Sequence, residues 1–348
     1  MISIHGGDLV SAKEVYQGEI LDLSVNLNPL GPPPEVRAAV AAVSLTQYPD
    51  PACRALRRAI ARRDGVDPAQ VFCGNGAAEV IFRLALALRP RSALLTAPTF
   101  SEYEAALTQV GCACRFHPLH PAQNFDVTET ILEDIRPDVD LVMLCNPNNP
   151  TGRLISENLL LQILARCEEA GAVLAVDECF LPLAQAGPGL APYLKDHPKL
   201  FLLRAFTKAY AVPGLRLGYG LCAPELAAQL AAWGPCWNVS GPAQAAGLAC
   251  CEKTGWAEQG RERIMALRPA LLEGLEALGC QVIPGQANYL LFRLPGVPDL
   301  KDRLLRRGIL IRSCANYRGL GPDWYRVAVG QKSENERLLA ELRNSLEA

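Results

Sequence analysis

The sequence lacks the patterns that mark metal sites, disulfide frameworks and nucleic-acid binding. It has 13 cysteines but no C-x-x-C pair, and only 4 histidines could act as further metal ligands. This spacing argues against a zinc site or a disulfide scaffold, so we expect buried thiols in a reducing compartment. The formal net charge is -2, and no basic block stands out. We therefore expect neither a metal nor a nucleic-acid partner.

Long apolar runs are missing as well. No uninterrupted apolar stretch approaches a membrane span. The first eight residues lack the basic region and apolar run of a secretion signal. From these features we expect a cytoplasmic protein that does not insert into a membrane. Half of the 348 residues are hydrophobic and 20% are charged, so a large buried core is expected.

Short apolar runs alternate with helix-length segments between residues 70 and 222. The expected strands are 71–73, 93–96, 141–145, 172–176 and 200–203, and the expected helices are 79–88, 102–110 and 158–169. The strands are apolar at nearly every position, which is typical of a parallel sheet covered by helices on both faces. The pattern therefore predicts an α/β domain.

The pattern changes after Gly241. A helical stretch is expected over 243–278 with breaks near Gly255 and Pro269, followed by strands at 289–292, 309–311 and 325–329 and a helix at 333–346. The first 34 residues are rich in turn residues and are predicted to form an extended arm rather than core. We predict an N-terminal arm (1–34), a large domain (35–238) and a smaller α+β C-terminal domain (239–348).

Polar residues follow three of the expected strands. Asn146 to Gly152 follow one strand, Asp177 closes the next, and Lys208 comes shortly after a third, with Arg216 eight residues further on. Ligands of open α/β sheets bind beyond the carboxyl ends of the strands. Each feature alone is typical of a loop, a cap or a solvated charge. Their occurrence after separate strands favours one shared binding site.

Together these residues resemble the aminotransferase-like superfamily of pyridoxal-phosphate enzymes, fold type I. The resemblance implies a large domain with a mostly parallel seven-stranded sheet, and it implies that Lys208 carries pyridoxal 5'-phosphate as a Schiff base. Asp177 would keep the pyridine nitrogen protonated, so that the ring can accept electrons from Cα. The other implied cofactor contacts are the backbone amides around Gly76, Ala77 and Ala78, the stacked ring of Phe100, and the side chains of Asn149, Thr207 and Arg216. Tyr48 resembles a tyrosine that reaches the phosphate from the partner subunit, which implies a homodimer.

Two features of the sequence depart from the common pattern of this superfamily. Phe180 stands where many relatives have a tyrosine, and Ala205 and Phe206 stand where many have a hydroxyl residue before the lysine. These departures cast doubt on transamination but not on cofactor binding.

Two arginines indicate the class of substrate. Arg326 resembles the arginine that binds the substrate α-carboxylate, and Arg312 resembles one that binds a substrate phosphate. His5 and Asn28 are further expected substrate contacts. The segments 5–7, 23–31 and 309–317 narrow the resemblance to members that act on small phosphorylated amino acids.

The activity that this resemblance implies is decarboxylation of L-threonine O-3-phosphate to (R)-1-amino-2-propanol O-2-phosphate, a step of cobalamin biosynthesis. The alternatives are decarboxylation of L-serine O-phosphate to ethanolamine phosphate and transamination of histidinol phosphate. A non-catalytic cofactor-binding module, as in transcription regulators that share this fold, is an alternative of a different class.

Overall fold

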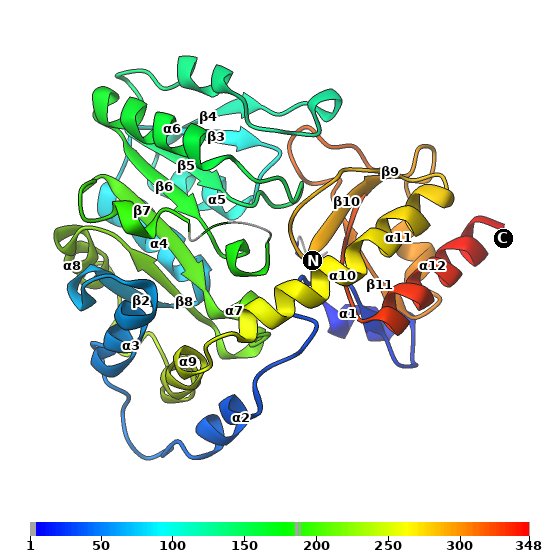
Figure 1. Ribbon diagram of the computed structural model, residues 1–348, viewed down its shortest axis with the longest axis horizontal. Helices are drawn as coiled ribbons and strands as arrows, with labels where there is room; N and C mark the ends of the chain where they lie inside the picture. The colour runs from blue at the N-terminus through cyan, green and yellow to red at the C-terminus, as the bar shows by residue number, and fades with distance from the viewer. Residues whose placement is uncertain (1–4, 185–186, 188, 348) are drawn as a thin grey trace.

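The computed structural model describes residues 5–184, 187 and 189–347. Its largest sheet has seven strands in the order β2-β8-β7-β6-β5-β3-β4 (Figure 1). The strands are β2 (Val71–Asn75), β3 (Ser92–Ala97), β4 (Ala113–Pro118), β5 (Leu141–Cys145), β6 (Val173–Asp177), β7 (Leu200–Ala205) and β8 (Leu217–Leu221). β8 is antiparallel to both of its neighbours, and the other pairs are parallel. The prediction of a mostly parallel seven-stranded sheet is confirmed.

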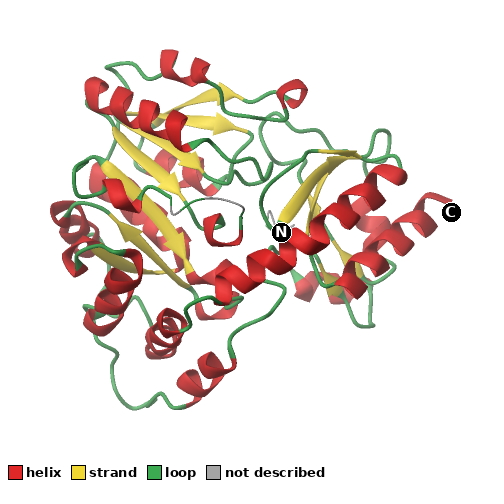
Figure 2. Ribbon diagram, viewed as in Figure 1, coloured by secondary structure: helices red, strands yellow, loops and turns green. Residues whose placement is uncertain are grey.

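Helices cover both faces of this sheet, as the apolar strands require (Figure 2). They are α2 (Pro34–Ala41), α3 (Arg54–Asp64), α4 (Gly76–Leu88), α5 (Glu102–Gln109), α6 (Glu157–Ala170), α7 (Phe206–Ala209), α8 (Pro224–Ala232) and α9 (Gly241–Glu252). One core packs α3, α6 and α9 against the sheet, and a second core packs α4, α5 and α8 against its other face. Every residue of β3 and β5 is buried between these layers. Short 3-10 helices occupy 68–70, 121–123, 129–133, 181–183, 191–193 and 213–215.

A second, antiparallel sheet forms the smaller unit, in the order β12-β13-β10-β9. Its elements are β9 (Gln281–Val282), β10 (Tyr289–Arg293), α11 (Leu300–Leu305), β12 (Arg312–Ser313), β13 (Trp324–Ala328) and α12 (Lys332–Glu347). The long helix α10 (Trp256–Ala277) runs from the larger unit to this smaller one (Figure 1). No described helix is long and apolar enough to cross a membrane.

The first 34 residues were predicted to form an extended arm rather than core, and part of the described segment differs from this expectation. α1 (Leu9–Val15) and β1 (Leu21–Asp22) form there, and β1 pairs in parallel with β11 (Ile309–Leu310). Leu23 joins the hydrophobic core of the smaller unit. A two-residue strand is too short to show a periodic pattern, so only its distant partner in the sequence defines it.

Two further details concern the predicted boundaries. The break near Gly255 is confirmed, but the break near Pro269 is wrong, because α10 continues through that residue. Pro269 and Met265 are both exposed, so water can solvate the carbonyl that the proline leaves without a donor. The domain boundary at residue 238 stays a prediction; α9, which follows it, packs on α2 and α3 of the larger unit.

Candidate active site

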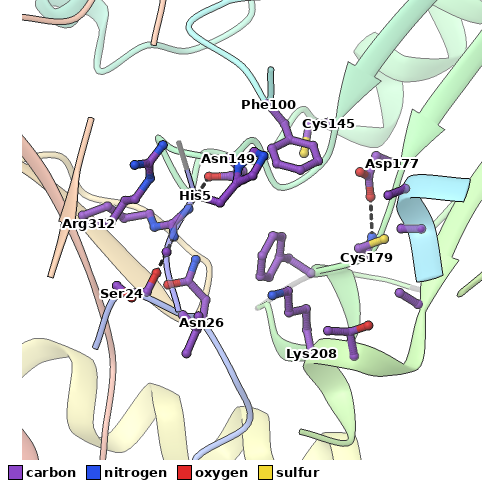
Figure 3. A pocket seen from close by; sticks show the side chains of 18 of the residues that line it. His5, Ser24, Asn26, Phe100, Cys145, Asn149, Asp177, Cys179, Lys208 and Arg312 are labelled. Atoms are coloured by element: carbon purple, nitrogen blue, oxygen red, sulfur yellow. Dashed lines mark hydrogen bonds between the residues drawn. The ribbon is translucent and has the colours of Figure 1, made fainter. Parts of the chain in front are cut away.

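A cavity of about 280 Å³ lies where the strand ends of the large sheet face the smaller unit. Segments far apart in the sequence meet there, including the N-terminal segment, the start of α4, the end of β6, α7 and the strands β12 and β13. Eleven of the residues expected at the site line it: His5, Ala77, Ala78, Phe100, Asn149, Asp177, Thr207, Lys208, Arg216, Arg312 and Arg326. In Figure 3, His5 and Arg312 lie on the opposite side of this space from Asp177 and Lys208.

Asp177 is the buried acid of the cavity. It is the last residue of β6, so the strand fixes its backbone. The Tyr103 hydroxyl donates to Oδ2 at 2.7 Å, and the backbone N–H of Cys179 donates to Oδ1 at 2.9 Å. Burial raises the pKa of Asp177, and the hydrogen bonds from Cys179 and Tyr103 oppose that rise. An acid held in this way can share a proton with a basic ring nitrogen.

Lys208 has the burial and the lowered pKa that suit a nucleophile. It lies in α7 directly after β7, and the backbone N–H of Asn28 donates to its carbonyl at 3.0 Å. Burial, together with the charges of Arg326 and Arg216, lowers the pKa of the Lys208 amine to about 8. A substantial neutral fraction is therefore available near that pH to attack an aldehyde. The Phe180 ring lies beneath the amine, with its centroid 5.6 Å from Nζ.

The turn between β2 and α4 forms a cradle for an anion. α4 begins at Gly76, and the side chain of its N-cap residue, Asn75, makes no capping hydrogen bond within the described part of the chain. A Cβ atom on Gly76 would lie 2.6 Å from the Arg216 guanidinium, and one on Gly218 would lie 2.5 Å from the Ala77 nitrogen. The two glycines therefore allow the guanidinium and the turn to come close. With Thr207 in the same cavity wall, these groups suit a phosphate.

Arg312 and Arg326 lie directly opposite each other on β12 and β13. Cross-strand partners place their side chains on the same face of a sheet, so both guanidinium groups reach the cavity. Arg326 donates to Asn149 Oδ1 at 2.5 Å and to the Ser24 carbonyl at 2.8 Å. Its buried Nε atom has no hydrogen-bond partner among the described residues. A buried donor without a partner suits an anionic ligand such as a carboxylate.

Three of the expected residues lie outside the lining of the cavity. Gly76 lies just behind it, against Arg216. Asn28 donates to the Ala209 carbonyl at 2.8 Å and accepts from Leu30 N at 3.0 Å, so its contacts support the loop of Lys208 rather than a substrate. Tyr48 is 81% exposed and packs on Trp237, with ring centroids 4.7 Å apart.

Sequence reasoning missed several residues of the site. Tyr103 binds Asp177, and the Tyr317 hydroxyl donates to Asn149 Oδ1 at 3.2 Å. Asn26 is buried against the cavity, and its side-chain oxygen has no partner among the described residues. Tyr103 comes three residues after Phe100, a helical spacing that places both on one side of a helix start. Asn26 lies within the segment 23–31 that carries the resemblance, but its place in the cavity wall was not predicted.

This set of groups fits pyridoxal 5'-phosphate. A partly neutral lysine, a buried acid and an uncapped helix start with an arginine are the groups that its aldehyde, ring nitrogen and phosphate need. The unpartnered Nε of Arg326 leaves a further anion site for a substrate.

Comparison with known proteins agrees with this geometry. The chain belongs to the aminotransferase class I and II family, whose model matches residues 18–342, and this membership confirms pyridoxal phosphate as the cofactor. It is 40% identical to the threonine-phosphate decarboxylase of Salmonella typhimurium, over 99% of this chain and 97% of that protein.

Solved structures show the same architecture. The histidinol-phosphate aminotransferase of Clostridium acetobutylicum superposes with a TM-score of 0.87 at 30% identity, covering 94% of this chain and all of that one. That of Sinorhizobium meliloti, in complex with pyridoxal-5'-phosphate, gives a TM-score of 0.84 at 22% identity, over 97% and 94% of the two chains. The second likeness supports the fold alone.

Proposed function

We propose that this protein is a pyridoxal-phosphate-dependent lyase that decarboxylates L-threonine O-3-phosphate to (R)-1-amino-2-propanol O-2-phosphate in cobalamin biosynthesis. The observation that carries the proposal is the pair Arg312 and Arg326, which face one cavity together with Lys208. A small substrate with an anion at each end matches this pair. The full-length similarity to threonine-phosphate decarboxylase supports the same activity.

The cofactor would be held by residues that line or adjoin the cavity. Lys208 would hold its aldehyde carbon, Asp177 its ring nitrogen and Asn149 its 3-oxygen, with Phe100 against the ring. The start of α4, Thr207 and Arg216 would hold its phosphate. When bound, pyridoxal phosphate supplies an electron sink for the negative charge that forms at Cα after a bond there breaks.

The chain's own residues decide which bond at Cα breaks. Arg326 would bind the substrate carboxylate and Arg312 the phosphate, with His5 close to the phosphate end. Two anchors at opposite ends restrict rotation of the substrate about Cα, and correct orientation of this kind lowers barriers by several kcal/mol, roughly 7–11 in ideal cases. The Lys208 amine, with its pKa of about 8, is one source of the proton that replaces the carboxylate on Cα, and a water molecule is the other.

Asn26 would add a polar contact that the arginines cannot make. Its side-chain oxygen accepts hydrogen bonds, whereas Arg312, Arg326 and Arg216 only donate. We propose that the Asn26 amide contacts the substrate, because a buried amide without a partner destabilises the empty site.

We further propose that the active unit is a cytoplasmic homodimer. The exposed side chains of Tyr48 and Trp237 pack on each other and form an apolar surface that a second copy could cover. All thirteen cysteines are free thiols, and most are buried, which suits a reducing compartment.

The decisive experiment is an assay of carbon dioxide release. Cofactor-loaded protein should release carbon dioxide from threonine phosphate without any 2-oxoacid, and Lys208→Ala should not. Comparison of kcat/KM with serine phosphate then identifies the preferred substrate, because one methyl group changes binding by only about 1–3 kcal/mol. Amino transfer that requires 2-oxoglutarate, with no carbon dioxide released, would refute the proposal in favour of a histidinol-phosphate aminotransferase.

A further inference from the structure

A largely buried network of charged side chains and one tyrosine lies behind the active-site strands, separate from the cavity. Its members come from the end of α3, the residue after β6, β7 and β8: Arg63, Asp64, Glu178, Arg204 and Tyr219. None of the five lines the cavity. The substrate and cofactor contacts described above therefore do not explain them.

The centre of the network is the pair Arg204 and Glu178. Arg204 donates to Glu178 Oε2 through Nε at 2.8 Å and through Nη2 at 2.6 Å, and its Nη1 lies 3.3 Å from Asp64 Oδ2. Glu178 is fully buried, and its other oxygen accepts from the backbone N–H of Leu190 at 2.9 Å. Both oxygens of the carboxylate are therefore satisfied inside the protein.

The outer part of the network reaches the helix that carries Lys208. Arg63 donates to both oxygens of Asp64, at 2.8 and 3.2 Å, and also to the Tyr219 hydroxyl, which itself donates to Asp64 at 2.9 Å. The Arg63 guanidinium also lies over the ring of Phe206, 5.0 Å from its centroid. Phe206 is fully buried in α7, two residues before Lys208.

The chain position of each member connects the network to the reacting groups. Asp177 and Glu178 are consecutive, and consecutive side chains of an extended strand project to opposite faces. Asp177 therefore faces the cavity while Glu178 faces the network, and the backbone N–H of Glu178 still bonds to Leu203 of β7 at 2.8 Å. Arg204 lies in β7, four residues before Lys208. The ion pair therefore joins the two strand ends that carry the acid and the amine.

Stability alone is a poor explanation for this network. Burying charges is costly, and well-packed apolar side chains of similar volume often replace a buried ion pair without loss of stability. An ion pair with several hydrogen bonds does, however, fix the relative position of its two strands more narrowly than apolar contacts do.

We propose that the Arg204–Glu178–Asp64 network is a positioning device that fixes Lys208 relative to Asp177. Its members are positioning residues, because none touches the cavity. This inference rests on the proposed function in one respect: the proposed function assigns Lys208 and Asp177 their roles toward the cofactor.

The first test removes both charges at once. The double variant Glu178→Leu/Arg204→Met keeps the volume and leaves no unpaired charge, and the surface pair Arg166→Met/Glu169→Leu of α6 is the matched control. We expect kcat on threonine phosphate to fall at least about 10-fold in the buried-pair variant, with KM changed by less than about 2-fold, because a small misplacement of reacting groups costs rate rather than binding. The control should match the wild type.

A second readout needs neither substrate nor cofactor. Labelling of Lys208 by an amine-reactive reagent, followed by mass spectrometry across pH in the cofactor-free protein, reports the pKa of the amine. Its midpoint should lie near the pKa of about 8 in the wild type. Asp177, Cys179, Arg216 and Arg326 are the charged or titratable groups that act on this amine. In the variant, looser strand ends should admit water and raise the midpoint by roughly half a pH unit or more.

The outcomes separate the two proposals. An unchanged midpoint together with unchanged kcat in a folded double variant would mean that the network only supports the fold. If the double variant does not fold, Tyr219→Phe removes one hydroxyl of the network without changing its charge, and the same two results from that variant would overturn the inference. Failure of the wild type to release carbon dioxide would refute the proposed activity, whereas the labelling midpoints would still test the network.

Discussion

A single hydroxyl group supports the buried acid of the site. Tyr103 is fully buried and donates to Asp177 Oδ2 at 2.7 Å. In Tyr103→Phe the pKa of Asp177 should rise further, because burial already raises it and this hydrogen bond opposes the rise. A hydrogen bond to a charged group contributes about 1.5–3 kcal/mol, so we expect cofactor affinity or kcat to fall roughly 10- to 100-fold. Absorbance titration with cofactor measures the affinity, and Tyr193→Phe, which loses a surface bond to Glu157, is the control.

Lys208 makes the stability of the cofactor-free protein depend on pH. Its pKa is about 8 in the fold, against about 10.5 in an unfolded chain. Between these values the unfolded chain binds more protons, so the free energy of unfolding should rise with pH through this window. From pH 8 to pH 10.5, the free energy of unfolding of the wild type should rise by at most about 3 kcal/mol relative to that of Lys208→Met. Urea unfolding at several pH values tests this, and a constant difference would show that the amine titrates normally.

The site residues that were predicted from the sequence have a local sequence pattern, whereas those that were missed do not. Asp177 ends an apolar strand, and Lys208 and Asn149 come shortly after two others, so local pattern and family resemblance point to the same positions. Tyr103 acts through a hydrogen bond to a residue distant in the sequence, and Asn26 lines a cavity that distant segments form. No local pattern encodes either arrangement. Their roles required the folded arrangement.

At the level of elements, the close packing of β8 against the start of α4 depends on Gly218, which has no side chain. A Cβ atom on Gly218 would lie 2.5 Å from the Ala77 nitrogen and 2.7 Å from the Gly76 carbonyl carbon. Gly218→Ala should push this turn away from the cavity and weaken binding of the cofactor phosphate roughly 5- to 150-fold, since overpacking typically costs about 1–3 kcal/mol. Gly214→Ala is the control, because a Cβ atom there would meet nothing within 4 Å. Equal cofactor dissociation constants for the two variants would contradict this account of the turn.

Five of the seven strands of the large sheet were predicted because each is a nearly continuous apolar run, whereas β4 and β8 were not predicted. β5 was predicted with its observed ends, and the ends of β3 and β6 lie within about two residues of those predicted. β1 and β12 have only two residues each, and pairing with distant strands defines them. Short strands of this kind lie below the length at which a periodic pattern can be read.

At the scale of the whole molecule, the predicted division sets the N-terminal arm apart from the large and small domains. In the structure this segment contacts both units. Its strand β1 belongs to the smaller unit, and the Ser24 carbonyl accepts from Arg326. His5 reaches across the cavity to Glu102 of α5, with Nε2 and Oε1 2.8 Å apart. The segment therefore joins both units around the site, which composition alone could not indicate.

The proposed homodimer can be tested through the position of Tyr48. This side chain is 81% exposed and lies outside the cavity of its own subunit, so it can contribute only to the site of a second copy. If it does, each active site needs Lys208 from one subunit and Tyr48 from the other. Tyr48→Ala and Lys208→Ala homodimers should each be strongly impaired. In a mixed dimer, however, one site contains both intact residues and the other contains neither.

Mixing the two variants under conditions that exchange subunits should therefore restore roughly a quarter of wild-type activity, because about half of the dimers are mixed and each has one intact site. Carbon dioxide release before and after exchange measures the gain, and sedimentation verifies the dimer. A mixture of Lys208→Ala with Asp177→Ala is the control, because both lesions belong to the same subunit's site. One subunit of each mixed dimer then lacks the lysine and the other lacks the acid, so no activity should return. If the mixture of Tyr48→Ala with Lys208→Ala likewise releases no carbon dioxide, Tyr48 does not contribute to the partner's site.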